Sequence, residues 1–155
     1  MNLLAYSIIL LLVVPCAYSE EPVTFCDLMQ NPEKYNDKEV TVRATYRFGY
    51  EWSYLYCLGC LDQGRAGLEL PPNYDGLDKA SQRALKRLPK SAGIANITVR
   101  GVFEGPGTFG HQGGYRYKFA VKEVGNTVLL IKGMRTSDEE KNVEQKWACG
   151  GANPK

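Results

Sequence analysis

The chain has little histidine and no large excess of charge of either sign. His111 is the only histidine, so a metal site built on two histidines is excluded. No G-x-S-x-G or H-E-x-x-H pattern occurs, and those patterns mark serine hydrolases and zinc proteases. With 19 basic and 17 acidic residues the net charge is only +2, which argues against a binder of duplex DNA. We therefore expect a non-enzyme with no catalytic residues, no metal and no cofactor.

Long apolar runs are scarce as well. One uncharged run, residues 3–14, lies at the start of the chain; it is too short to span a membrane and has the length of the apolar core of a secretion signal. Ala17 and Ser19 supply small residues three and one positions before the expected cut, as signal peptidase requires. We expect a signal peptide at residues 1–19 and a secreted or periplasmic protein with no transmembrane segment after it.

A lipid-anchored form is the alternative to simple secretion. The leader has no basic residue, and Cys16 stands where a lipid could be attached. Pro15 directly before Cys16 fits a lipoprotein cleavage box poorly. The unanchored form is therefore favoured.

Four cysteines remain after the leader is removed: Cys26, Cys57, Cys60 and Cys149. An even count in an exported protein favours disulfides, and three pairings are open. The spacing of Cys57 and Cys60 also fits half of a zinc site or a redox pair. Zinc would require Cys26 and Cys149 to converge on the same point, and a redox pair normally opens a helix, whereas a turn follows here. We expect all four cysteines to form disulfides.

The hydrophobic pattern predicts short helices and five main strands. Thr24 with Asp27 three residues later predicts a helix beginning at about Phe25. Alternation of apolar and polar residues predicts strands, and a 3.6-residue period with Asp75 as a possible cap predicts a helix. The predicted strands are 40–48, 52–57, 66–70, 97–103 and 115–121, with a sixth short one at 126–131, and the predicted helix is 77–88.

The order of these elements predicts an all-β fold with accessory helices. Five strands with a helix between the third and the fourth form the layout of a five-stranded OB-fold barrel. We expect this domain to span residues 20–133, and a polar tail, partly helical, to occupy residues 134–155. The expected core residues are Val40, Val42, Leu85, Ile97, Val99, Phe119 and Val121.

A short motif near the N-terminus resembles a known kind of OB domain. It consists of Leu28, the run Asn31-Pro32-Glu33-Lys34-Tyr35, Lys38, Val40, Val42 and Arg43. This motif is similar to the start of OB domains of the anticodon-binding-like type, which small exported bacterial proteins of unassigned role also carry. The resemblance implies a fold and a habit of binding ligands, and it implies no reaction.

Aromatic rings occupy every second position from Tyr46 to Tyr56. If the turn near Gly49 has an odd number of residues, these rings join the core. If it has two or four, Trp52, Tyr54 and Tyr56 face outward. Each buried tyrosine hydroxyl needs a hydrogen-bonding partner, so we expect the outward arrangement, although the sequence leaves both open.

Two aromatic-rich loops indicate a ligand site. In an OB-fold the loops after strands one and four flank the same groove, where ligands stack on rings. The expected ligand-binding residues are Arg47, Tyr50, Trp52, Tyr54, Phe109, His111 and Tyr115. We expect the groove to bind an oligosaccharide, single-stranded nucleic acid or another ligand. The alternative is a disulfide-stapled protein-interaction or structural accessory domain whose rings merely suit β-strands.

Overall fold

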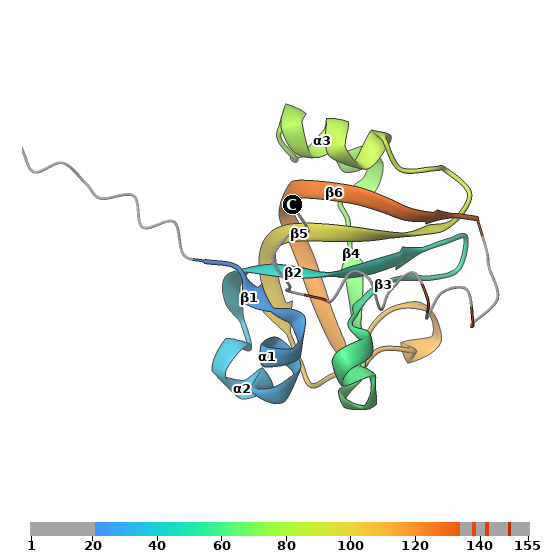
Figure 1. Ribbon diagram of the computed structural model, residues 1–155. Coiled ribbons are helices and arrows are strands. Elements are labelled where there is room, and N and C mark those ends of the chain that lie inside the picture. The colour runs from blue at the N-terminus through green and yellow to red at the C-terminus, as the bar shows by residue number, and fades with distance from the viewer. Residues whose placement is uncertain (1–20, 134–137, 139–141, 143–148, 150–155) are drawn as a thin grey trace, which may run out of the picture.

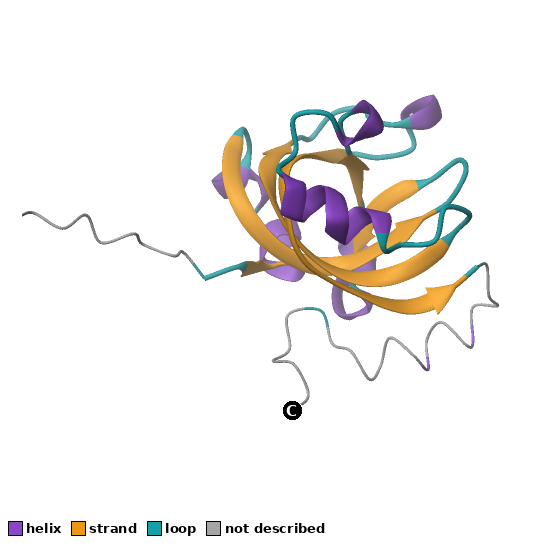
Figure 2. Ribbon diagram, turned by 90° about the horizontal axis from the view of Figure 1, so that it is seen from above, coloured by secondary structure: helices purple, strands orange, loops and turns teal. Residues whose placement is uncertain are grey.

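The computed structural model describes residues 21–133 together with residues 138, 142 and 149. They form a β-barrel with short helices outside it (Figures 1 and 2). The expected signal peptide and most of the expected tail lie outside the described residues. In the part described, no helix is long and apolar enough to cross a membrane. Three short 3-10 turns connect the strands: η1 (Leu58–Gln63), η2 (Pro72–Tyr74) and η3 (His111–Gly113).

The N-terminal segment folds onto the barrel as β1 (Val23–Thr24), α1 (Phe25–Gln30) and α2 (Pro32–Tyr35). The predicted helix start is confirmed: the Asp27 backbone N–H donates to Thr24 Oγ1 at 3.0 Å. This bond satisfies one of the N–H groups that a helix leaves open at its first turn. Leu28 is fully buried, so apolar packing contributes to holding α1 on the barrel.

Five strands close the barrel: β2 (Lys38–Phe48), β3 (Ser53–Tyr56), β4 (Ala66–Glu69), β5 (Gly93–Glu104) and β6 (Tyr117–Lys132). Neighbouring strands run antiparallel, except that β4 and β6 are parallel. The pairing of β2 with β5 closes the ring. This connectivity, with a helix between β4 and β5, is the predicted OB-fold.

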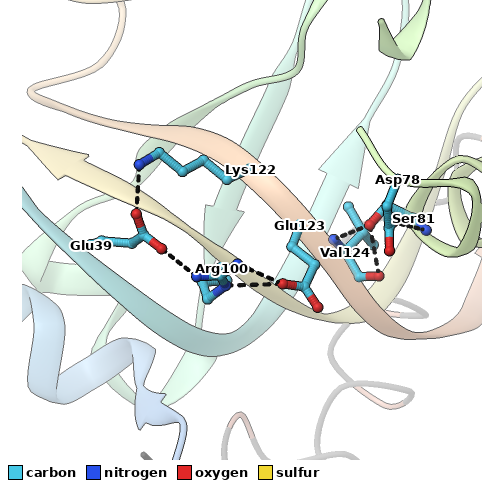
Figure 3. Close-up of polar contacts among 7 residues, drawn as sticks. All are labelled: Glu39, Asp78, Ser81, Arg100, Lys122, Glu123 and Val124. Carbon is cyan, nitrogen blue, oxygen red and sulfur yellow. Dashed lines mark hydrogen bonds and ion pairs between the residues drawn. The ribbon is translucent and has the colours of Figure 1, made fainter. Parts of the chain in front are cut away.

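That helix, α3 (Lys79–Lys86), lies at one end of the barrel, away from α1 and α2 (Figure 1). Asp78 caps it rather than Asp75, because its carboxylate accepts the Ser81 backbone N–H at 2.7 Å. The Ser81 hydroxyl accepts the Val124 N–H of β6 at 2.8 Å and reaches the Val124 carbonyl at 3.3 Å (Figure 3). A single serine thus joins the capped turn of α3 to the barrel wall.

Most of the predicted core is confirmed, and one strand prediction is wrong. Six of the seven expected residues are buried, and Val40 is half-buried against them. The predicted strands 115–121 and 126–131 are one continuous strand, β6. The long β5 pairs along its whole length, and bulges between Ile97 and Val99 and at neighbouring positions absorb the bend.

The hairpin between β2 and β3 settles which way the alternating rings face. Four residues, 49–52, separate Phe48 from its partner Ser53, and Tyr46 is paired with Leu55. Since side chains alternate along a strand, Tyr46 shares the inner face with Leu55, which is fully buried. The side chain of Tyr54 therefore lies on the opposite face.

The expectation that Tyr54 and Tyr56 coat the exposed surface is nevertheless wrong. Both are buried, at 7% and 5% exposure. Arg65 lies 4.9 Å and the Tyr115 ring 5.7 Å from the Tyr54 ring. Cys149 lies against the Tyr56 carbonyl. The outer face of β3 is thus covered by other parts of the chain, which the alternation alone does not reveal.

The expected disulfides are confirmed and their pairing is defined. Cys26 of α1 is bonded to Cys60 of η1, and Cys57 at the end of β3 is bonded to Cys149. The first bond fixes the N-terminal helix to the turn after β3. The second holds a residue from the C-terminal part of the chain against the barrel, where its sulfur is 3.3 Å from Thr45 Oγ1.

A chain of charged side chains crosses the outside of β2, β5 and β6 (Figure 3). Arg100 binds Glu39 on one side and Glu123 on the other, the latter through Nε at 2.9 Å. Lys122 donates to the second oxygen of Glu39 at 2.5 Å. The hydrogen bond from Lys122 lowers the pKa of Glu39. All four groups are in contact with solvent, so the network favours the strand pairing only weakly.

Candidate ligand-binding groove

The two aromatic loops named in the sequence analysis flank one groove of about 790 Å³. The β2–β3 loop forms one wall, the β5–β6 loop forms the other, and β3 and β4 supply the floor. Its lining residues are Gly49, Tyr50, Glu51, Trp52, Ser53, Gly67, Leu68, Glu69, Thr108, Phe109, Gly110, His111, Tyr115 and Lys118.

The first wall is a tight turn that carries Tyr50 and Trp52. The Gly49 N–H donates to the Trp52 carbonyl at 2.8 Å, which closes the turn. The Trp52 indole packs on Gly49 so closely that a β-carbon there would lie 2.5 Å from its Nε1. The indole can pack there because Gly49 has no side chain. Tyr50, at the tip of the turn, is 99% exposed.

The second wall is fixed by a small bridge between Phe109 and Tyr115. Each residue's N–H donates to the other's carbonyl, at 2.9 and 3.1 Å. The Tyr115 ring lies between Gly67 of β4 and Gly110, which has a left-handed φ of 72°. Partial burial raises the pKa of the Tyr115 phenol, and the neighbouring Tyr54 phenol adds to the shift. The ring is thus a half-buried, neutral platform at ordinary pH.

One lysine stands at the β4 edge of the groove. Lys118 Nζ lies 3.2 Å from a carboxylate oxygen of Glu69 and 3.1 Å from one of Glu104. It also lies 5.4 Å from the centre of the Phe109 ring. The hydrogen bond to Glu104 and the contact with Glu69 raise the pKa of Lys118, so it stays charged. Two carboxylates already compensate this ammonium.

The floor carries a short hydrogen-bonded relay. Ser53 Oγ donates to the Leu68 carbonyl at 3.0 Å, and the Tyr46 hydroxyl lies 3.2 Å from the same Oγ. Burial raises the pKa of Tyr46 to about 12. The relay satisfies polar groups beneath the groove and joins its floor to the barrel interior.

The structure brings together five of the seven predicted ligand-binding residues: Tyr50, Trp52, Phe109, His111 and Tyr115. The other two do not line the groove. Tyr54 supports Tyr115 from behind, with the ring centres 5.7 Å apart, and Arg47 lies opposite Tyr54 on β2. His111 is exposed in η3.

Sequence reasoning missed the acidic side of the groove. Glu51 follows Tyr50 in the first loop, and Glu69 is the last residue of β4. The parallel pairing of β4 with β6 places Gly67 beside Lys118, and this brings Glu69 within reach of the lysine. The predicted OB layout already implies this pairing, so the contact could have been found from strand order and charge together.

Comparison with known proteins assigns the chain to no family. No protein-family model matches the chain, and no curated protein matches it. The fold and the groove define the chain as an OB-fold barrel with an aromatic cleft between its β2–β3 and β5–β6 loops.

Proposed function

We propose that this chain is an exported, non-enzymatic OB-fold module that binds an oligosaccharide in the groove. The observation that carries the proposal is the convergence of four rings, Tyr50, Trp52, Phe109 and Tyr115, from two segments far apart in the sequence. Planar rings facing a shared groove are the usual stacking platforms for sugar and base rings. The resemblance to anticodon-binding-like OB domains is consistent with a binding role.

The charge of the groove favours a neutral ligand over a nucleic acid. Among the described residues, the carboxylates that line it are Glu51 and Glu69, and the single ammonium is Lys118. Summed over these three side chains, the lining has a net charge of −1. Single-stranded nucleic acid is usually bound in a positively charged groove that tracks the phosphates. Carboxylates instead accept hydrogen bonds from sugar hydroxyls, and rings stack on sugar faces.

A binding role fits the polar groups better than catalysis does. The chain's only histidine, His111, is exposed on a glycine-rich loop, where nothing described holds it as a base. The carboxylate of Glu69, which lines the groove, already forms an ion pair with Lys118. A protein-interaction role would call for a flat apolar patch, whereas these rings line a concave groove.

Export is part of the proposal. The apolar leader and the two disulfides support it, because disulfides persist in oxidising compartments. Expression of the full chain in a secreting bacterial host should release a protein whose N-terminal residue is Glu20. Recovery of the uncut chain from the cytosol would contradict export, and a lipid on Cys16 would show the anchored form instead.

The binding proposal is tested by titrating two ligand classes at two salt concentrations. Mixed neutral oligosaccharides and a single-stranded oligonucleotide are each added to the mature protein, and tryptophan fluorescence or calorimetry follows binding. We expect saccharide binding that barely depends on salt. Trp52→Ala and Phe109→Ala should each weaken it by about 1–3 kcal/mol.

Tyr74→Ala serves as the matched control, because Tyr74 is a half-buried tyrosine outside the groove. It should leave the affinity unchanged. Steeply salt-dependent oligonucleotide binding would keep the groove and replace its ligand. If the groove variants lower the melting temperature strongly and neither ligand binds, the accessory-domain alternative is correct.

A further inference from the structure

All four cysteine sulfurs of the described chain meet at one place beside the barrel. The Sγ atoms of Cys26, Cys57 and Cys60 lie within 4.8 Å of one another. Cys149 completes the group because it is bonded to Cys57. Four cysteines from α1, the end of β3, η1 and the C-terminal part of the chain therefore occupy one site, and the two disulfides lie side by side.

Once the two S–S bonds are broken, this arrangement leaves the sulfurs close to the spacing that a metal site requires. Tetrahedral zinc bound by four thiolates has Zn–S distances of about 2.3 Å, which places the sulfurs about 3.8 Å apart. No two of these three sulfurs lie more than 4.8 Å apart, and reduction frees the bonded pair Cys26–Cys60 to separate to that spacing. Cys57 and Cys60 are separated by two residues, which is the ligand spacing of many structural zinc sites.

The surroundings also suit thiolate ligands. Cys57 and Cys60 are 4% and 1% exposed, whereas Cys26 and Cys149 are half-buried. The buried pair is shielded from water, and the half-buried pair gives a reductant or an ion a way in. The Thr45 hydroxyl, 3.3 Å from Cys149 Sγ, can donate to a thiolate there. Such outer contacts orient metal ligands and tune their basicity.

We propose that the reduced chain binds one thiophilic divalent ion, of the zinc class, through these four sulfurs. A phosphine reductant supplies two electrons to each disulfide, breaking the S–S bond. For each disulfide, one water supplies two protons to the two sulfurs and its oxygen to one phosphine, which becomes a phosphine oxide. The ion then displaces the protons of the thiols as it binds. Metal and disulfides use the same sulfurs, so they exclude each other. This site is independent of the groove and of its ligand.

The test uses the full mature chain, reduced with a water-soluble phosphine under anaerobic conditions and titrated with Co²⁺. We expect one equivalent to bind with intense thiolate-to-cobalt charge transfer and the strong visible bands of a tetrahedral site, and Zn²⁺ to displace it. The oxidised chain should bind none. A pale octahedral spectrum, or no saturation near one equivalent, would overturn the proposal.

Paired variants separate the site from loose binding by free thiols. Cys26→Ser with Cys60→Ser leaves two thiols, and Cys57→Ser with Cys149→Ser leaves the other two. Each reduced double variant should lose affinity on the order of a hundredfold or more, since half of the ligands are gone. Equal affinity in a double variant would contradict a four-sulfur site.

The fold of the reduced chain is followed by far-ultraviolet circular dichroism in the same samples. If reduction unfolds the chain, one equivalent of Zn²⁺ should restore the β-sheet spectrum, because metal binding and folding are then coupled. If Zn²⁺ fails to restore it, the proposal is wrong.

Discussion

The ring of Tyr115 packs directly on Gly67: a β-carbon at position 67 would lie 2.8 Å from Tyr115 Cδ2. Gly110 and Tyr54 contact the same ring from other sides, so the side left open to the ring is the groove. Gly67→Ala should therefore displace Tyr115 and lower the free energy of unfolding by about 1–3 kcal/mol, as overpacking does. Denaturant titration measures the stability, and the saccharide titration measures the accompanying loss of affinity.

Gly125→Ala is the matched control for this substitution. Gly125 also lies in a strand of the barrel, but a β-carbon there would be in ordinary contact, 3.4 Å from the nearest atom. It should change stability and affinity little. If Gly67→Ala behaves like the control, Tyr115 is not held by the glycine.

Ser81 is the second residue whose loss should be costly. It is fully buried, and its hydroxyl is the partner of both the N–H and the carbonyl of Val124. Ser81→Ala leaves these buried groups without that partner, which should cost about 1–3 kcal/mol of unfolding free energy. The exposed neighbour Lys79, changed to Ala, should alter the unfolding free energy by less than about 0.5 kcal/mol. Similar effects of the two substitutions in a guanidinium titration would show that α3 is held in another way.

Tyr46 makes the fold sensitive to alkali. Burial raises the pKa of its phenol to about 12 in the folded protein, against about 10 in the unfolded chain. Between these values the folded state binds more protons than the unfolded state, so stability falls as the pH rises. The stabilisation is complete below about pH 10 and is lost towards about pH 12, a change on the order of 3 kcal/mol.

Tyr46→Phe removes this titration and should flatten the pH dependence of the unfolding free energy in that range. Urea titrations of both proteins at about pH 8 and about pH 11 make the comparison. An equally steep loss in the variant would assign the alkaline sensitivity to other tyrosines.

The sequence predicted the barrel because its signals were local. The alternation from Val40 to Phe48 and the helical period around Leu85 can each be recognised within a single strand or helix. The order of the predicted elements then indicates the OB-fold. The burial of Tyr54 could not be predicted in the same way. It depends on Arg65 and Tyr115, which come from other segments, and alternation assigns a face without saying what covers it.

The aromatic residues of the groove were predicted from the sequence, whereas its charged residues were missed. The predicted fold places the loop of Trp52 beside the loop of Phe109, so aromatic content and strand order together located the site. The contact between Glu69 and Lys118 depends on the parallel pairing of β4 with β6. Parallel neighbours are far apart in the chain, so no local pattern reveals this pairing, and it follows only from the strand order of the predicted OB-fold.

The last prediction tests whether charge selects the ligand. Glu51→Gln with Glu69→Gln changes the lining of the groove from −1 to +1 without moving a ring. Among the described residues, it also leaves Glu104 as the remaining carboxylate partner of Lys118. Saccharide affinity should fall by roughly tenfold for each carboxylate that accepts a hydroxyl. Oligonucleotide affinity should rise and become salt-dependent, because phosphates now meet a positive groove.

The control variant is Glu21→Gln with Glu33→Gln. It changes two exposed carboxylates of the N-terminal segment and makes the same change in net charge outside the groove. If this control variant gains oligonucleotide affinity equally, overall charge and not the groove governs binding, and the carboxylates have no part in selecting the ligand.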